Sequence, residues 1–350
     1  MENVSQNTKP NNFDLVTLDK NLPDTLDAWA EFYFSFEVTT SELSQKEQKR
    51  DMNLFLSFMA KEIGNLERTN WTPRLTQSFV EYMRHKTDVK GKRRWGDKYI
   101  NRIMATIKTF AKWVHKYKPF PLDNPTIKIR SLPTGLVLDI ERAITGQERN
   151  RILDAADSLL ISGGISKDRK RYKTGARPKR KNYRPYRNRA IIYTLTETGM
   201  RRKAVTNIDI HNINFDRKTI SVVEKGGFTH SPKISQEGLN AIKAYIDRER
   251  LIDNERWNSP TLFLSNSPNK KGNGRLTPQV INSIWNDVCK KAGIEGRTPH
   301  STRHGMGNYL IEKTGNIAVA QRQLGHRNPA HTMIYCQAKE EVIEKALDER

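Results

Sequence analysis

The sequence predicts a mainly α-helical fold of the α+β class, with one small β-sheet, divided between two bodies. Three observations predict it. Apolar residues recur every three or four positions over most of the 350 residues, whereas the alternation typical of a strand is confined to 219–234. A stretch with four prolines, at 118–135, interrupts the helical pattern. The length also exceeds one average domain of about 100 to 200 residues, so we expect two domains.

The first domain is expected over residues 23–130. Residues 1–22 before it are polar and lack periodicity, which favours a flexible arm. Apolar positions then indicate helices near 24–36, 52–63, 75–83 and 98–114. The last of these helices also has a basic face, which either is ordinary solvated surface or contacts DNA. With the basic run KGKRR at 90–94 just before it, we favour DNA contact and predict that these residues take part: Arg93, Arg94, Lys98, Arg102, Lys108 and Lys112.

The second domain is expected over residues 145–338, after a linker at 131–144. Thr145 and Glu148 have the spacing of a capping box and should start a helix that runs to about Leu160. A buried helix at 190–198 and a hairpin that turns at Lys225-Gly-Gly, between the runs 219–223 and 229–234, should follow. Further helical patterns cover 236–252, 277–291, 301–313, 316–324 and 339–348, the last within a C-terminal tail helix at 339–350.

Net charge predicts an acidic partner. The chain has 61 Lys and Arg against 39 Asp and Glu, a formal charge of +22. Nucleic acid is the favoured partner and an anionic membrane surface is the rival. No apolar run approaches the roughly 18 residues of a spanning helix, and the first residues lack a signal-peptide pattern. We therefore expect a soluble protein of the cytoplasm, without membrane contact. The two cysteines, Cys289 and Cys336, cannot form a disulfide framework or a four-cysteine zinc site.

A strongly basic insertion is expected at 162–189. Its part 167–189 holds twelve Lys or Arg and one Asp, which is half of the net charge. Such a run either stays a disordered loop that repels itself or contacts a phosphate backbone, for which the interleaved tyrosines are suited. We favour phosphate contact outside the core DNA site, through Arg171, Lys179, Arg180, Lys181 and Arg184.

Several kinds of chemistry are excluded by missing patterns. The sequence has no Walker A motif, no Gly-x-Gly-x-x-Gly after a strand and no closely grouped carboxylates. We therefore expect no ATP, no metal and no other cofactor. His300 and His304 are four residues apart at a helix start, as zinc ligands can be. Ser301 stands where a metalloprotease has its general-base Glu, however, and Arg303 would repel a cation, which disfavours zinc.

Five short motifs follow one another in an informative order: Thr198-Gly-Met-Arg201, the hairpin Lys225, His300-Ser-Thr-Arg303, Leu324-Gly-His326 and, nine residues after that histidine, Tyr335. In this set and spacing the chain resembles the tyrosine recombinase (phage integrase) family, by motif over about 145–340. The resemblance implies a helical SAM-like core-binding domain and an integrase-type catalytic domain that form a C-shaped clamp on DNA.

The resemblance also implies a metal-independent chemistry. Arg201 and Arg303 would neutralise the nonbridging phosphate oxygens, and Tyr335 would attack the phosphorus. His300 would be the general base, Lys225 the general acid for the 5′ oxygen, and His326 a hydrogen-bond donor to the phosphate. The product would be a 3′-phosphotyrosyl enzyme, which keeps the bond energy for rejoining and needs no ATP.

Some alternatives stay open. Lys233 on the same hairpin could replace Lys225, and Tyr309 also lies nine residues after a histidine, His300. Family members commonly carry an acidic residue three positions after the first arginine, where this chain has Ala204. A catalytically silent DNA-binding regulator of the same fold therefore stays a rival, as does a type IB topoisomerase.

The family resemblance implies partners too: double-stranded DNA, a homotetramer on two synapsed sites with the tail helix docked on a neighbour, and optional DNA-bending or directionality factors. We expect a prokaryotic or mobile-element enzyme of the nucleoid, which integrates and excises DNA.

Overall fold

The structure is a computed structural model that describes residues 23–38, 41–134, 143–164, 182–223, 227–267, 273–333, 335 and 347–348. The chain divides into two compact units, Met1–Leu136 and Val137–Arg350, and each is described by itself. The expected arm, residues 165–181 of the expected insertion, residues 224–226 of the hairpin and most of the tail lie outside the described residues. The bounds of the domains stay a prediction.

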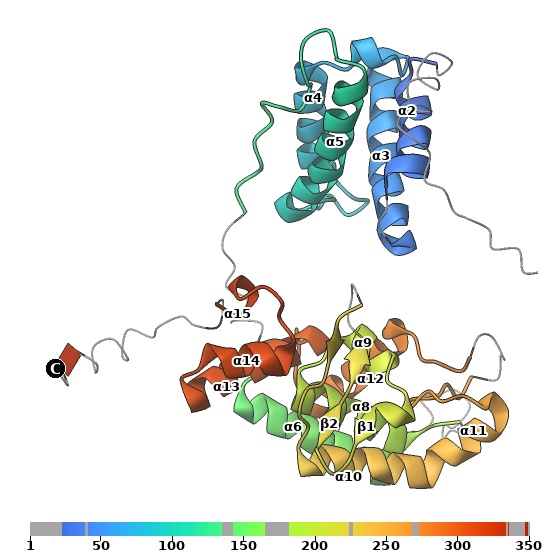
Figure 1. Ribbon diagram of the computed structural model, residues 1–350, viewed down its shortest axis with the longest axis vertical. Coiled ribbons are helices and arrows are strands. Elements are labelled where there is room, and N and C mark those ends of the chain that lie inside the picture. Colours follow the sequence, from blue (N-terminus) through green and yellow to red (C-terminus); the bar gives the residue numbers. More distant parts are fainter. Residues whose placement is uncertain are drawn as a thin grey trace, which may run out of the picture. The chain divides into compact units, whose positions relative to one another are not determined.

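The N-terminal unit is helical (Figure 1). Its buried core is rich in aromatic side chains. Its elements are α2 (Leu26–Phe32), the π-helical turn η1 (Tyr33–Glu37), α3 (Glu42–Ile63), the 3₁₀ turn η2 (Arg68–Asn70), α4 (Pro73–His85) and α5 (Asp97–Tyr117). Local signals set the helix ends. The Thr72 side chain accepts a hydrogen bond from the Leu75 amide at the start of α4, and Gly64 ends α3 with a φ of 81°.

The proline-rich stretch from 118, which interrupts the helical pattern of the sequence, packs onto this unit. Phe120 and Ile129 are buried in the aromatic core. The Leu132 amide donates to the side chain of Asn101 at 2.8 Å, and the Lys108 ammonium donates to the Ile129 carbonyl oxygen at 2.6 Å. The prolines interrupt the helix, but Phe120 and Ile129 still reach the core.

The C-terminal unit is also mainly helical. Its helices are α6 (Gly146–Asp157), α7 (Leu159–Ser162), α8 (Pro185–Thr198), α9 (Arg202–Thr206), α10 (Gln236–Tyr245), α11 (Leu251–Trp257), α12 (Pro278–Ala292), α13 (Pro299–Thr314), α14 (Ile317–Leu324) and α15 (Ala330–Met333), with turns η4 (Ile210–Asn212) and η5 (Ile246–Arg250). The capping box at Thr145 and Glu148 is confirmed, with both reciprocal hydrogen bonds formed. Helix α8 is buried along most of its length and packs against α6, α10 and α13.

Two small antiparallel pairs supply the β structure. Strand β1 (Ile213–Asn214) pairs with β2 (Thr219–Ile220), and β3 (Val222–Val223) pairs with β4 (Thr229–His230). The sequence predicted one hairpin over 219–234 and missed β1, because two residues are too short to show alternation. The two β-pairs, on a mainly helical unit, confirm the α+β class. Among the described residues no helix is long and apolar enough to cross a membrane.

Candidate active site

The turn after α8 places the first arginine motif next to α13 and α14. Gly199 ends α8 with a φ of 66°, a conformation that favours glycine. A Cβ atom on Gly199 would lie 2.8 Å from Leu324 and 3.1 Å from Met306, so the turn packs closely on both helices. Arg201, two residues on, is exposed.

Arg303 lies at the centre of the site. It is only 1% exposed, and its guanidinium donates to the carbonyl oxygens of Gly199 at 3.1 Å and Leu324 at 2.5 Å. Three motifs distant in sequence therefore meet at one buried cation. Because backbone oxygens hold two of its five donors, the guanidinium plane is fixed before any substrate arrives.

His326 follows the Leu324-Gly325 turn and is uncharged. Burial, with the positive charges of Arg303 and Arg201, lowers the pKa of His326 to about 3. Its Nδ1 atom lies 2.9 Å from the hydroxyl of Thr332, which is fully buried. A Thr332 hydroxyl that donates to Nδ1 leaves the imidazole proton on Nε2, as a hydrogen-bond donor.

Tyr335 is packed between two histidines. Its ring stacks on that of His326, with centroids 6.3 Å apart and planes at 16°. Its hydroxyl lies 3.0 Å from Nδ1 of His304, and only 7% of the residue is exposed. A Cβ atom on Gly307 would lie 2.7 Å from the tyrosine ring, so glycine permits this close packing.

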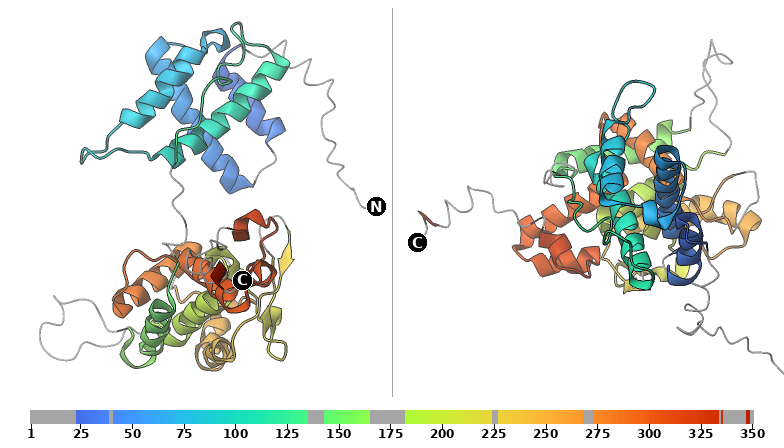
Figure 2. Two further views of the ribbon diagram at one scale, coloured as in Figure 1. Left: turned by 90° about the vertical axis from the view of Figure 1, so that its left-hand side faces the viewer. Right: turned by 90° about the horizontal axis from the view of Figure 1, so that it is seen from above.

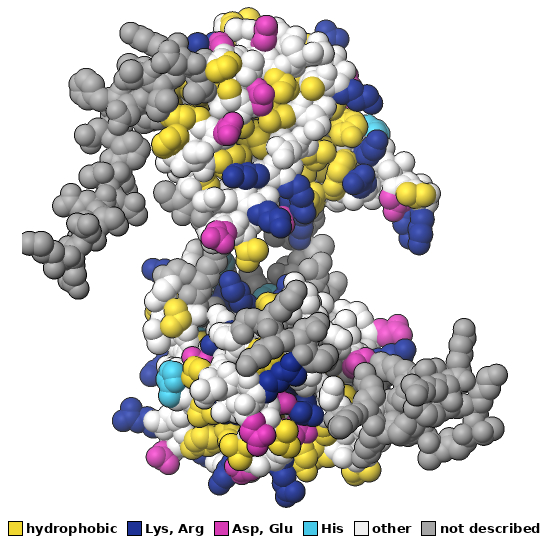
Figure 3. All heavy atoms as spheres, turned by 90° about the vertical axis from the view of Figure 1, so that its right-hand side faces the viewer, with side chains coloured by type: hydrophobic (Ala, Val, Ile, Leu, Met, Phe, Trp, Pro, Cys, Tyr) yellow, Lys and Arg dark blue, Asp and Glu magenta, His cyan; other side chains and the backbone are white. Residues whose placement is uncertain are grey.

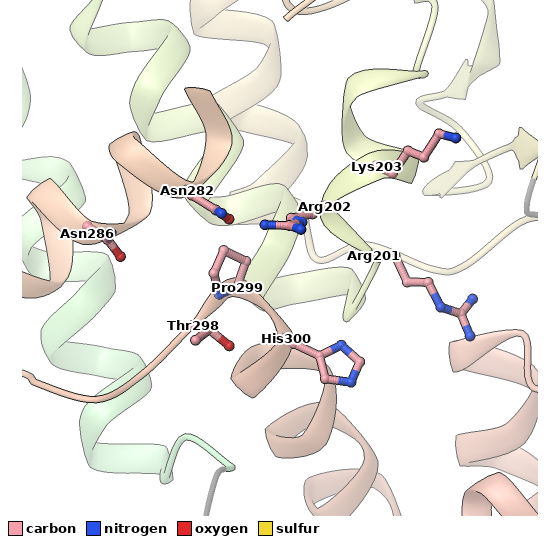
Figure 4. Close-up of a pocket in the computed structure, with 8 residues that line it drawn as sticks. All are labelled: Arg201, Arg202, Lys203, Asn282, Asn286, Thr298, Pro299 and His300. Atoms are coloured by element: carbon pink, nitrogen blue, oxygen red, sulfur yellow. The ribbon is translucent and has the colours of Figure 1, made fainter. Parts of the chain in front are cut away.

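Arg201 and His300 line one open cavity of about 570 Å³ (Figure 4). Their side chains approach the opening from the turn after α8 and from the first turn of α13. Arg202 extends toward Asn282 on α12, whereas Lys203 points away. The ring of His300 also meets that of His304 edge to face, with centroids 4.6 Å apart. The cavity therefore adjoins the ring that contacts the tyrosine hydroxyl.

Comparison with known proteins agrees with this geometry. Residues 174–341 match the phage integrase family. Tyrosine recombinase XerA of Pyrococcus furiosus is 32% identical over 163 residues, which are 46% of this chain and about half (54%) of the relative. Tyrosine recombinase XerC of Anoxybacillus flavithermus is 24% identical over 326 residues, 90% of this chain and 93% of the relative. Residues 174–341 belong to the phage integrase family.

Structural comparison supports the fold of this chain. The crystal structure of XerH site-specific recombinase bound to palindromic difH substrate, a post-cleavage complex, matches with a TM-score of 0.67 at 16% identity. The match covers 98% of this chain and 90% of that chain. A likeness at this identity shows the two-domain fold.

The hairpin to which Lys225 belongs is tied to the site, although Lys225 itself lies outside the described residues. The His230 side chain on β4 donates from Nε2 to the carbonyl oxygen of Arg322 at 3.0 Å. The side-chain amide of Gln323 donates from Nε2 to the Lys233 and Thr198 carbonyl oxygens at 2.8 and 3.3 Å. These contacts connect the hairpin base to two motifs, and the sequence showed no signal for them because their partners lie about 90 or more residues away.

The two rival residues have other surroundings. The Lys233 ammonium donates to the carbonyl oxygen of Arg217 at 2.7 Å, which occupies it at the base of the hairpin. Tyr309 is 55% exposed and lines a second cavity, of about 760 Å³, with Ile144 and Leu310. The structure thus groups Arg201, His300, Arg303, His326 and Tyr335, and adds His304 and Thr332. The spacing of His304 from His300 suggested a zinc ligand and gave no sign of the contact with Tyr335.

Several of the predicted DNA-binding residues have partners within the protein. Arg102 donates both terminal nitrogens to the buried Asp51, at 2.7 and 2.8 Å, and Lys108 is bound to Ile129 as described above. Arg184 forms a largely buried ion pair with Asp253 at 2.7 Å. The Arg184 guanidinium holds the start of α8 to α11, and its contact with DNA stays a prediction. Arg171, Lys179, Arg180 and Lys181 lie outside the described residues.

The remaining predicted DNA-binding residues are exposed on α5 and on the loop before it. Lys98 and Lys112 are exposed on α5. Arg93 and Arg94 are exposed on the loop between α4 and α5, which reaches away from the helices (Figure 2). Arg93 forms an ion pair with Asp97, and Arg94 lies over the Trp95 ring. In Figure 3 basic side chains gather on this loop and on the edge beside it.

Proposed function

We propose that this protein is a site-specific recombinase that cuts and rejoins duplex DNA through a 3′-phosphotyrosyl intermediate, and that the event is integration and excision of a mobile element. The packing of Tyr335 against His326, beside the buried Arg303, carries the proposal. It places a nucleophile, a neutral donor and a fixed cation within one set of contacts.

The chemistry follows from charge and protonation. The Arg201 and Arg303 guanidinium groups stabilise the negative charge that grows on the nonbridging oxygens. His326 donates from Nε2 to one of these oxygens, since its pKa of about 3 keeps the ring neutral. Tyr335 forms the bond to phosphorus as the bond to the 5′ oxygen breaks, and Lys225 protonates that leaving oxygen. The phosphotyrosine keeps the ester energy for the second strand, so rejoining needs no ATP.

The site keeps the contacts of Arg303 although Ala204 stands where family members commonly carry an acidic residue. Ala204 is buried in the hydrophobic core of the unit. The carbonyl oxygens of Gly199 and Leu324 hold Arg303, and this support does not depend on a carboxylate. An intact set of contacts around Tyr335 favours an active enzyme over a silent regulator of the same fold. A type IB topoisomerase remains the second alternative, since it would use the same intermediate.

DNA contact by the α4–α5 loop is part of the proposal. Residues 84–94 are all exposed and hold six Lys or Arg against one Asp. The loop is internally bonded, because the Asp88 carboxylate accepts from the Lys90 and Lys92 amides and the Arg94 amide donates to the Lys86 carbonyl. A preordered basic loop can neutralise phosphates without an ordering cost.

We also propose a tetramer on two synapsed DNA sites, with accessory bending or directionality factors where a reaction direction is imposed. The tail KEEVIEKALDER has Val342, Ile343, Ala346 and Leu347 at helical spacing. The cavity lined by Ile144, Tyr309 and Leu310 offers apolar surface for such a helix from a neighbouring copy.

Covalent trapping tests the function. Wild type and Tyr335→Phe are incubated with a nicked, partly randomised duplex library, and denaturant-resistant adducts are isolated and sequenced. We expect adducts from wild type alone, which also identifies the core site. Relaxation of a supercoiled plasmid without that site would favour the topoisomerase. Binding of a native-element site without any adduct would favour the silent regulator.

The finer proposal, on the biological event, has its own assay. A plasmid with two copies of the trapped site in direct repeat should lose the intervening segment as a circle, and the circle should reinsert. Deletion without reinsertion under any arrangement of the two sites would restrict the enzyme to resolution and contradict integration.

A further inference from the structure

The tyrosine hydroxyl has a defined partner that the motif comparison did not assign. The Tyr335 oxygen lies 3.0 Å from Nδ1 of His304, both residues are buried, and their ring centroids are 5.6 Å apart. We propose that His304 accepts the phenolic proton as Tyr335 attacks the scissile phosphate. The inference rests on the proposed function and adds a catalytic residue to it, because His304 touches the reacting atom.

The packing fixes this hydrogen bond. Gly307, one turn after His304 on α13, lets the tyrosine ring lie against the helix, and the His326 ring stacks on it. The Tyr335 amide also donates to the Thr332 carbonyl oxygen at 3.0 Å, which ties the backbone of the nucleophile to α15. With ring and backbone both held, the hydroxyl stays directed at Nδ1 of His304.

The proton balance requires an acceptor at this position. A tyrosine with an ordinary pKa of about 10 keeps its proton at neutral pH, so the proton must leave during attack. A neutral imidazole with its proton on Nε2 has a lone pair on Nδ1 that can accept it. The O–H bond of Tyr335 breaks and an N–H bond forms on His304, while the Oη–P bond forms and the P–O5′ bond breaks. The 5′ oxygen takes its proton from the general acid, and religation returns the His304 proton to tyrosine.

His300 then has a different position in the reaction. Its ring meets the His304 ring edge to face and lines the cavity with Arg201. From there it can contact a phosphate oxygen. Its ring also lies against the ring of His304, which becomes positively charged when it accepts the proton. The prediction that His300 is the general base is thus replaced, in this proposal, by a division of work between the two histidines.

The first test separates a proton acceptor from a residue that only holds the ring. In His304→Asn the amide oxygen replaces Nδ1 as a hydrogen-bond acceptor but has no useful basicity. We expect single-turnover cleavage of a nicked duplex, carrying the core site recovered by trapping, to fall about a hundredfold or more. DNA affinity should stay within about twofold, as fits a loss of chemistry. His211→Asn, the same change at an exposed histidine, is the matched control and should cleave as wild type does.

The second test restores the missing driving force. Fluorinated tyrosine at position 335 has a lower phenol pKa and needs less help from a base. In the His304→Asn background we expect it to recover at least about tenfold of the lost rate, and in the wild-type background to change the rate little.

The outcomes distinguish the role of His304 from the proposed function. Near wild-type cleavage by His304→Asn, or no recovery with fluorotyrosine, overturns the role of His304 while an inactive Tyr335→Phe leaves the proposed function standing. Equal cleavage by Tyr335→Phe and wild type would remove the proposed function and this inference together.

Discussion

Arg303 donates a hydrogen bond to the carbonyl oxygen of Gly199, 104 residues earlier in the chain, at 3.1 Å. The same guanidinium reaches Leu324, just before the Gly-His pair, at 2.5 Å. One buried cation therefore sets the distance between the turn that carries Arg201, the helix that carries His300 and the turn that carries His326. Positioning and electrostatic stabilisation depend on the same side chain, and its replacement should affect both.

Arg303→Lys should show this double effect. Lysine keeps the charge but lacks the planar fork, so its single nitrogen cannot reproduce the two contacts that the two guanidinium nitrogens make. Because a buried acceptor without a partner costs about 1 to 3 kcal/mol, we expect a lower free energy of unfolding. Single-turnover cleavage should fall about 10² to 10³-fold, as for the loss of one donor to a transition-state oxygen. Arg202→Lys, on the neighbouring residue that extends toward Asn282, is the control. It should keep the free energy of unfolding of wild type and should change the cleavage rate by no more than a factor of about two.

The pKa of His326 predicts how stability changes with pH. The folded-state pKa of about 3 lies below the ordinary value of 6.5, so the unfolded chain binds the proton more readily. The contribution of this residue to stability is therefore complete above pH 6.5 and is lost progressively as the pH falls from 6.5 toward 3. Melting temperatures of wild type and His326→Asn, measured from pH 7.5 to 4, should converge as the pH falls. A constant difference over this range would contradict the depressed pKa.

Arg184 should behave as a structural residue. Its side chain is 15% exposed and that of Asp253 is 5% exposed, so removal of the guanidinium leaves a buried carboxylate without this partner. We expect Arg184→Ala to lower the free energy of unfolding by about 3 to 5 kcal/mol in denaturant titration. At a temperature where the variant is folded, its salt dependence of DNA binding should match wild type. A shallower salt slope with unchanged stability would return Arg184 to the DNA-binding residues.

The α4–α5 loop should account for part of the salt dependence. In Lys90→Ala/Lys92→Ala the two charges are lost while Asp88 still accepts the two backbone amides. We expect the slope of log affinity against log salt to decrease by about 1.8, if both side chains neutralise phosphates. Lys61→Ala/Lys116→Ala removes the same charge at the last turns of α3 and α5 and is the comparison. Equal slopes for both double variants would place the loop off the DNA.

Sequence reasoning succeeded where the signal is local. The capping box at Thr145 is complete within four residues, and the helix bounds on α12 and α13 differ from the predicted ones by one or two positions. The short motifs likewise indicated the residues that lie around Arg303, because each motif can be recognised within a few consecutive residues.

Sequence reasoning failed where the partner of a residue is distant in the sequence. A basic residue such as Arg102 or Arg184 gives no sign of a carboxylate 51 or 69 residues away. His300 and His304 share one face of α13 by spacing, but which ring meets Tyr335 depends on how the turn after α14 packs. Strand β1 was missed since two residues carry no periodicity.

The tail helix provides the last prediction. Truncation after Gln337 removes the apolar positions Val342, Ile343, Ala346 and Leu347 but leaves Tyr335 in place. Cleavage of a single site should persist, whereas joining of two duplexes into one complex, measured by sedimentation, should be lost. Ile343→Asp in the full chain should reproduce the loss, because a charge at a buried contact is costly, and Lys345→Ala should not. Intact synapsis by the truncated chain would show that the tail packs on its own domain or on nothing, and that the cavity beside Tyr309 is not its acceptor.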